Sequence, residues 1–498
     1  MAGKQRGSME FSFSTGPDTG SRRIEDRPFS ILVVGDFSGR GGSGERPPLA
    51  QRRPLAVDVD ELDNVMARLK VALQFPPDAS SSAILDLPFS QLDDFHPDQI
   101  YAKAPVFARL RELRQKIQNP ATFEAAAAEV RSWADTRPDA PAQTPSTAPS
   151  PAPAAADAGA SPFAQLMDKR VSPHAASKTR YSADPKIDEF IGQIVKPHVV
   201  ASKDPDQDDL LSAVDKATSR HMNAILHHAD FQALEATWRG LDFLIHNLET
   251  DENLTLQMLH VSRDEMATDL MSGNDLRQSQ LYRVLVKEAR LAPGGVPWAL
   301  VVGLYTFRKN ESDAALLRRW GELAAAAGAP FMAGSEYAPG DEDAGGAGWR
   351  ELLAGQAADH VALAVPRMLL RLPYGPDTES VESFPFNEMD AQPVHAAYLW
   401  GNPAVACACL IGQTFSESGW SMRLGSIDRL GGLPLHVWTE DGEKNMTPPA
   451  EFWLTDADAE GLIARGLIPL CSVRGSDAIA IPRFLSVSGR AIPLGPRS

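Results

Sequence analysis

Cysteine is scarce in this chain of 498 residues, in which Cys407, Cys409 and Cys471 make up the whole set. An odd and sparse set cannot build a disulfide framework, and it is typical of proteins kept in a reducing compartment. We therefore expect the chain to work in the cytoplasm.

Long apolar runs are missing, and positive charge is under-represented. Segment 403–411 is short and Arg367 interrupts the run at 361–372, so neither approaches the ~20 residues that span a bilayer. The 48 Lys and Arg residues face 65 Asp and Glu residues, which gives a formal net charge of −17. We therefore expect no membrane insertion and no nucleic-acid binding, and an acidic surface that suits a basic protein partner.

Catalytic signatures are also few. The glycines at 39–44 match GxGxxG, but Glu-Arg-Pro-Pro follows at 45–48, so no helix N-terminus can cradle a phosphate there. No GxSxG elbow occurs, and Glu379, Glu382 and Glu388 are interpreted as carboxylates on a solvated loop. We expect no enzymatic activity and no cofactor.

Three histidines, His221, His227 and His228, lie close together in the sequence. A metal site would need at least one further ligand, and Cys407 and Cys409 lie far away in an apolar segment. We expect the histidines at helix ends, the cysteines in the core and no bound metal.

Composition divides the chain. Residues 136–160 are rich in Pro, Ala, Ser and Thr and cannot form a packed core, which predicts a linker. This boundary predicts four parts: a first domain at 1–135, the linker, a helical segment at 161–250 and a core at 251–498.

Hydrophobic periodicity predicts a mixed α/β fold with sheets, flanking helices and a helical segment between the two parts. The expected strands are 29–34, 71–75, 83–87, 254–261, 298–305, 331–333 and 360–365. The expected helices are 59–69, 107–117, 123–133, 282–289, 314–326 and 404–415. Segment 221–245 predicts two amphipathic helices, the second capped by Asp230 and packed through Trp238 and Leu241. Trp400, Trp420 and Trp453 are also expected to pack against apolar neighbours.

Two segments have the pattern of interaction elements. Phe163, Leu166, Met167 and Val171 form a narrow apolar stripe on a predicted short helix that follows the linker. Such a stripe predicts either a helix that docks into a partner's groove or one that packs permanently on its own domain. Near the N-terminus, Met9, Phe11 and Phe13 alternate with polar residues, as in a half-buried strand.

Ordered motifs over most of the chain resemble the contractile sheath proteins of bacterial type VI secretion systems. The first part is similar to the small subunit, TssB, and the later part to the large subunit, TssC. The segments similar to TssB are VVGDF (33–37), LPF (87–89) and the acidic stretch 94–98. Those similar to TssC are HMNAILHHADFQALEATWRGLDFLI (221–245), PRMLLRLPYG (366–375), FPFNE (384–388), YLWGNPA (398–404), GW (419–420), GGLPLH (431–436) and GLIPL (466–470).

The resemblance implies a fused sheath subunit without catalysis, which assembles with other sheath subunits around the Hcp tube and drives its ejection by contraction. It also implies contact with the baseplate, exchange of the strand at Met9, Phe11 and Phe13 between neighbours, and recognition of helix 163–171 by the AAA+ recycling ATPase, ClpV. The resemblance also implies a C-terminal region beyond the motif RGSD at 474–477, and we expect this chain to be without it. The alternative is therefore a non-polymerising adaptor, cap or regulator that binds sheath, baseplate or ATPase.

Overall fold

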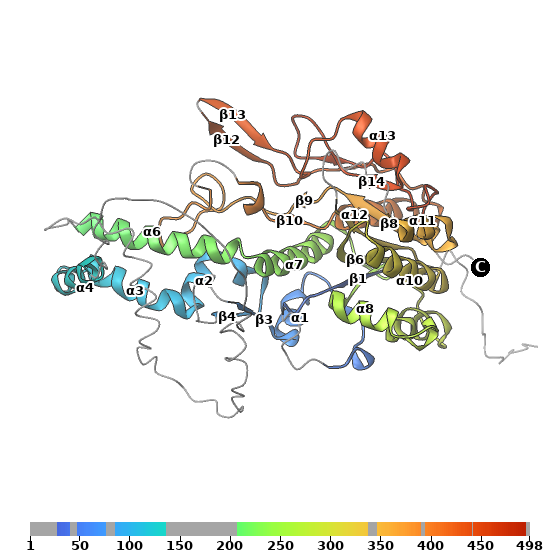
Figure 1. The fold of residues 1–498 in the computed structure, drawn as a ribbon, viewed down its shortest axis with the longest axis horizontal. Coiled ribbons are helices and arrows are strands. Elements are labelled where there is room, and N and C mark those ends of the chain that lie inside the picture. The colour runs from blue at the N-terminus through green and yellow to red at the C-terminus, as the bar shows by residue number, and fades with distance from the viewer. Residues whose placement is uncertain are drawn as a thin grey trace, which may run out of the picture.

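The computed structural model describes residues 27–39, 47–75, 85–135, 207–336, 346–389, 394–440 and 442–494. It has the mixed α/β architecture that the sequence predicts, with a sheet-centred body and a helical arm (Figure 1). The residues of three predictions lie outside the described ranges: the strand at Met9, Phe11 and Phe13, the linker, and helix 163–171.

One seven-stranded sheet organises the body, in the order β14-β8-β7-β6-β1-β5-β2. All neighbours are parallel except β2, which runs antiparallel to β5. The strands are β1 (Phe29–Gly35), β2 (Leu55–Ala56), β5 (Leu254–His260), β6 (Leu300–Phe307), β7 (Phe331–Ser335), β8 (Val361–Val365) and β14 (Leu467–Pro469).

Strand β1, from the first half of the chain, is a central strand of this sheet. Val33 is paired with Met258 of β5 on one side and with Val302 of β6 on the other. All seven residues of β1 are buried, as the apolar sequence FSILVVG predicts for a strand covered on both faces. The two halves of the chain therefore share one sheet.

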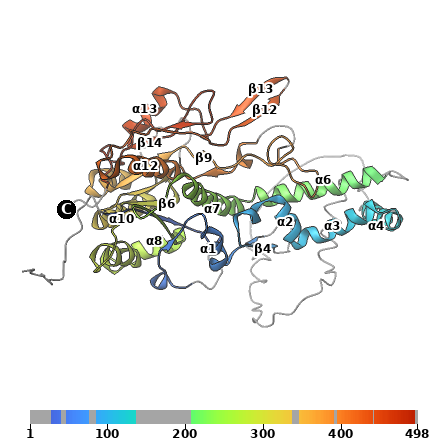
Figure 2. The same cartoon turned by 180° about the vertical axis from the view of Figure 1, so that it is seen from behind.

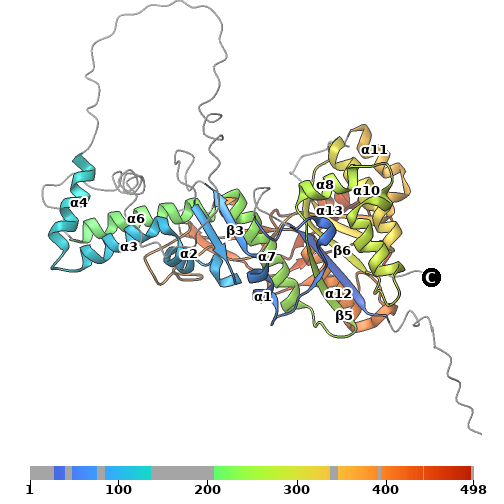
Figure 3. The same cartoon turned by 90° about the horizontal axis from the view of Figure 1, so that it is seen from below.

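Helices cover both faces of the sheet (Figure 3). Side chains of β1 alternate between two core clusters: Ile31 and Val33 enter one, and Leu32 and Val34 enter the other. The cluster of Ile31 also contains residues of α7 (Ala229–Asn247) and α12 (Ala404–Ser418), whereas the other contains residues of α8 (Arg263–Met271) and α10 (Glu311–Ala327).

Other helices complete the body and the arm. They are α1 (Leu62–Leu69), α2 (Pro97–Lys103), α3 (Pro105–Gln118), α4 (Phe123–Asp135), α6 (Gln207–Leu226), α9 (Gln280–Tyr282), α11 (Ala347–Ala354) and α13 (Asp456–Ala464). The helix predicted at 282–289 is α9 followed by a π-helix over Arg283–Leu291.

The predicted cap of α7 is wrong by two residues. His228 is the N-cap, since its Nδ1 accepts the backbone N–H of Asp230 at 3.3 Å, and Asp230 lies in the first turn. From that position the Asp230 carboxylate interacts favourably with the positive end of the helix dipole.

The arm joins helices of both halves (Figure 1). Helix α3 lies along α6, and the Arg114 guanidinium binds the Asp215 carboxylate at 2.7 Å. The Gln207 side-chain amide donates to the Ile117 carbonyl at 2.6 Å. The halves are therefore paired in the arm as well as in the sheet.

Short strands form small sheets apart from the main sheet, most of them on the side of the body that carries α13 (Figure 2). They form β3 (Val71–Phe75) with β4 (Leu85–Phe89), β9 (Met368–Leu369) with β10 (Trp400–Gly401), β12 (His436–Glu440) with β13 (Glu443–Thr447), and a sheet of β11 (Arg429–Leu430), β16 (Ile479–Ala480) and β15 (Cys471–Ser472). The β3–β4 pair belongs to the first half and lies beside α1 and α2, apart from the other short sheets.

In the described ranges, no helix has both the length and the apolar character needed to cross a membrane.

Candidate functional site at the junction of the two halves

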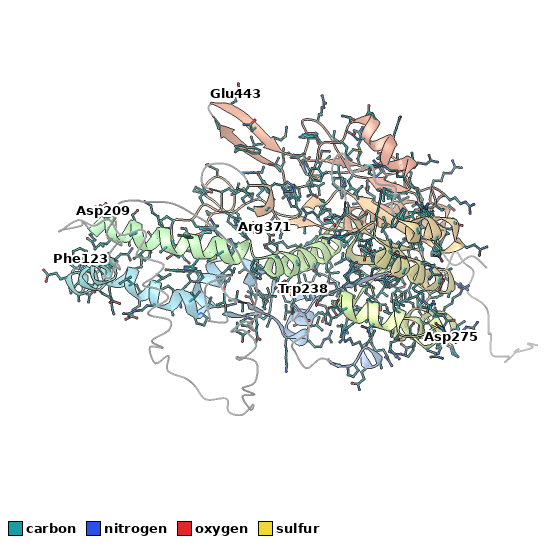
Figure 4. The ribbon with its side chains drawn as sticks, in the orientation of Figure 1. Phe123, Asp209, Trp238, Asp275, Arg371 and Glu443 are labelled. Atoms are coloured by element: carbon teal, nitrogen blue, oxygen red, sulfur yellow. The ribbon has the colours of Figure 1, made fainter. Side chains whose placement is uncertain are left out.

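A buried cluster of charges connects α7 to the segment that follows β9. The guanidinium of Arg371 binds Glu235 on α7 at 2.8 Å and Glu388 at 2.8 Å, and all three side chains are buried. Arg239, one turn after Glu235, binds the same carboxylate at 2.7 Å and reaches the Tyr374 hydroxyl at 3.0 Å. Figure 4 shows Arg371 and Trp238 beside α7 in the middle of the molecule.

Glu388 and Arg371 stay ionised because they are paired with each other. Burial opposes the charge on Glu388, but Arg371, a hydrogen bond with His227 and the backbone N–H of Tyr374 outweigh it and lower the pKa of Glu388 to about 2. Burial alone would lower the pKa of Arg371, yet Glu235 and Glu388 hold that pKa well above its usual value. Removal of one partner would leave an uncompensated buried charge.

The sequence interpretation of Glu388 as a solvated loop carboxylate is therefore wrong, whereas Glu379 is exposed. The prediction failed because the charge that compensates Glu388, on Arg371, lies 17 residues away and is brought to it by the fold. Burial of a carboxylate is stable only with such a partner.

A second contact joins α7 to the end of β1. The Trp238 indole donates from Nε1 to the Phe37 carbonyl at 2.9 Å, and the two rings meet edge to face at 5.2 Å between centroids. The Phe37 backbone N–H in turn donates to Nδ1 of His260, at the end of β5, at 3.0 Å. Both halves therefore meet at the ends of adjacent strands.

Aromatic and acidic residues of the first half extend the junction. Phe89 stacks on Phe95 at 4.3 Å, and both rings meet Phe231 of α7 edge to face. The Asp98 carboxylate accepts the backbone N–H groups of Glu382 at 3.1 Å and Ser383 at 2.9 Å. Most of the sequence motifs therefore converge at one place.

The three histidines have separate positions. His221 is buried in α6, His227 binds Glu388 at 3.2 Å, and His228 caps α7. Over the described ranges, no group of three His, Cys, Asp or Glu side chains is placed to hold a metal ion. Burial raises the pKa values of the Cys407 and Cys409 thiols, which keeps both in their unreactive neutral form.

The predicted packing residues occupy different environments. Trp238 and Leu241 are fully buried, and Trp400 is 7% exposed, with its Nε1 bound to the His395 carbonyl at 3.0 Å. Trp420 is partly buried against the core and donates to the Arg27 carbonyl at 2.7 Å. The expectation for Trp453 is wrong, because 44% of this residue is exposed.

A groove of about 960 Å³ opens at the carboxyl ends of β1 and β6. The sheet order reverses between these two strands, which is where ligand crevices form in doubly wound sheets. One wall of the groove is α7, and the other contains Tyr398 and Trp400.

Sequence reasoning missed the roles of Arg371, Glu235 and Arg239. A signal was present, since each charge lies among apolar residues in a motif segment: LEATWRGL on α7 and MLLRLPYG after β8. A single charge within an apolar run indicates a buried pair, but it does not identify the partner.

The contacts at this junction hold the two halves of the chain together. Its paired charges, capped backbone groups and stacked rings connect segments that are distant in sequence, and this arrangement stabilises one interlocked body.

Comparisons with known proteins agree with the motif positions. Residues 208–338 and 341–488 match the family described as EvpB/VC_A0108, tail sheath N-terminal domain. Residues 4–129 match the family described as Type VI secretion system, VipA, VC_A0107 or Hcp2. The type VI secretion system sheath protein TssC1 of Pseudomonas aeruginosa is 33% identical over 298 residues, which cover 55% of this chain and 59% of that relative. The chain therefore spans about three-fifths of the length of this relative.

Proposed function

The chain belongs to the tail sheath family of type VI secretion systems, and on that premise we propose that it is a structural sheath subunit in which one chain supplies both the small and the large subunit. Residues 1–135 correspond to the small subunit, 136–160 to the linker, 161–250 to the helical start of the large subunit and 251–498 to its core. The proposed role is assembly and contraction, without catalysis.

The position of β1 is the observation that carries this proposal. It belongs to the part of the chain that matches the VipA family, and it lies between β5 and β6 of the part that matches the tail sheath domain. A strand hydrogen-bonded on both sides makes the two parts one rigid body, which is what a subunit that transmits force between its neighbours requires.

The proposed partners follow from the family. They are further copies of the sheath subunits, the Hcp tube, the baseplate and the AAA+ recycling ATPase, ClpV, with assembly in the bacterial cytoplasm. Within the chain, Met9, Phe11 and Phe13 are proposed to lie on a strand exchanged between neighbours. Phe163, Leu166, Met167 and Val171 are proposed as the stripe that the ATPase recognises.

Electron microscopy of the purified full chain tests the proposal. Tubules or contracted polysheath, formed by the chain alone or together with a separate sheath pair, are expected. Monomers under all of these conditions, with binding to preformed sheath ends or to the baseplate, would replace the proposal with the adaptor function. A triple variant of Met9, Phe11 and Phe13 to Ser should abolish tubules and leave the monomer folded.

A further inference from the structure

The groove between α7 and the Tyr398–Trp400 wall has an unusual helix face. Ala229, Ala233 and Ala236 of α7 line it, and Ala229 and Ala233 are exposed to solvent. The outer face of a surface helix normally carries charged residues, whereas small apolar residues allow another backbone to approach closely. This face therefore fits a second element of protein structure.

The charge in the groove is acidic. Asp36 and Asp230 line it, and neither forms a salt bridge with Lys or Arg in the described part of the chain. The lining arginines are already bound, Arg263 to Asp313 and Arg367 to Glu451, each at 2.6 Å. A cationic, amphipathic occupant is therefore favoured over an anionic one.

We propose that segment 163–171 of the same chain docks in this groove as a helix, with Phe163, Leu166, Met167 and Val171 against the α7 alanines and the Tyr398–Trp400 wall. Helix-in-groove recognition uses anchors at this spacing. The groove volume of about 960 Å³ is enough to take such side chains, since pockets of about 300–1,000 Å³ enclose drug-sized molecules.

The predicted helix has a matching charge on the docking side. At 100° per residue, Arg170 lies about 20° from Phe163 and within the apolar stripe, whereas Lys169 lies about 120° away. A docked helix therefore brings Arg170 to Asp36 and Asp230 and keeps Lys169 in solvent.

The length of the tether fits docking within one chain. Residues 172–206 connect the segment to the start of α6, and the 20 residues of α6 lie between that point and the start of α7. A helix of that length is about 30 Å long, and 35 residues can extend over up to about 115 Å, so the connection is long enough for the segment to reach the groove. A tether that can span the two sites gives an effective concentration on the order of millimolar, so a groove affinity of even ~100 µM leaves the helix docked about tenfold more often than free.

Docking would place the four apolar anchors out of reach of other proteins. For recognition of this stripe by the ATPase, the helix would first have to leave the groove. This consequence rests on the proposed function. The docking itself depends only on this chain's residues.

Hydrogen exchange of the full-length monomer tests the docking. We expect amides of 163–171 to exchange at least about tenfold more slowly than in a peptide of the same sequence. The variant Ala233→Lys fills the groove and repels Arg170, so it should remove this protection. The matched control Ala224→Lys, at an exposed alanine of α6 outside the groove lining, should retain it.

A second pair of variants tests whether the charge of Arg170 contributes to the docking. Arg170→Glu should reduce the protection and Lys169→Glu should not. The docking would be overturned by unprotected amides in the unsubstituted chain or by protection that survives Ala233→Lys. Protection that appears only at high protein concentration would also overturn it, because a second copy of the chain would then supply the helix. Unaltered protection of β1 reports that each variant is folded, and tubule formation by the same preparations reports the sheath role independently.

Discussion

The indole Nε1 of Trp238 donates a hydrogen bond of 2.9 Å to the backbone carbonyl of Phe37, across 201 residues of chain. The contact fixes α7 of the second half against the end of β1 of the first, and both residues are fully buried. Interlocking of the halves therefore depends on a specific polar contact as well as on apolar packing.

The first prediction concerns this contact. Trp238→Phe should destabilise the chain by about 1–3 kcal/mol, because the Phe37 carbonyl would lose its buried partner. Denaturant unfolding of the full chain measures the change. Trp453→Phe, at a residue that is 44% exposed, is the matched control and should change stability by less than about 0.5 kcal/mol. Equal losses in the two variants would contradict the role assigned to Trp238.

The second prediction concerns the buried charges. Arg371→Met should cost about 3–5 kcal/mol, because Glu235 and Glu388 would face each other without a shared cation. Arg308→Ala removes the Arg308–Glu336 ion pair, whose side chains are both exposed, and should cost no more than about 1 kcal/mol. A small effect of Arg371→Met in the same unfolding assay would mean that solvent reaches the cluster.

The third prediction follows from the low pKa of Glu388. In the unfolded chain the carboxyl binds a proton near its ordinary value of 4.5, whereas in the folded chain it stays ionised down to about pH 2. Ionised Glu388 therefore stabilises the folded state fully above about pH 5. This stabilisation is lost as the pH falls from about 5 to about 2. The contribution is on the order of 3 kcal/mol, since one pKa unit corresponds to about 1.4 kcal/mol.

The free energy of unfolding should consequently fall as the pH falls from about 5 to about 2. Glu388→Gln should flatten this slope and lower the stability at pH 7, where the carboxylate is needed. Glu265, which Arg52 binds at 2.6 Å and whose pKa is also about 2, adds to the slope in both proteins. An unchanged slope in Glu388→Gln would show that other carboxyl groups dominate the acid response.

Local patterns predicted the elements well, but they could not predict their partners. The run FSILVVG predicts a strand covered on both faces, and the strand is there, yet nothing in its sequence identifies β5 and β6 as its neighbours. The same limit explains the failure at Glu388: local sequence gives the cost of burying a charge, while the compensating cation on Arg371 comes from tertiary structure. Residue types fix periodicity, whereas pairing over long separations depends on the whole fold.

The fourth prediction concerns the close packing of α10. A Cβ on Gly321 would lie 2.3 Å from the Ala357 carbonyl oxygen, which is backbone and cannot move aside easily. Gly321→Ala should therefore destabilise the chain by about 1–3 kcal/mol despite the better helix propensity of alanine. Gly461→Ala in α13, where the nearest atom is 3.8 Å away on the flexible Arg465 side chain, should instead stabilise it by about 0.5–1 kcal/mol. Thermal unfolding of the two variants should move in opposite directions, and a shift in the same direction would contradict the packing at Gly321.

The last prediction concerns the shared sheet. A protease site introduced into 136–160 allows the chain to be cleaved between the two halves after folding. The two fragments should still elute together in size-exclusion chromatography. They stay together because β1 is hydrogen-bonded to both β5 and β6, and α3 is bound to α6 through Arg114 and Asp215. The later half expressed alone should aggregate, because without β1 the edges of β5 and β6 are open to other chains. In the cleaved protein, Val33→Asp, which buries an unpaired charge beside β5 and β6, should release the fragments, whereas Asp58→Ala at an exposed position should not. Separation of the unsubstituted fragments under native conditions would mean that the linker, and not the shared sheet, holds the halves together.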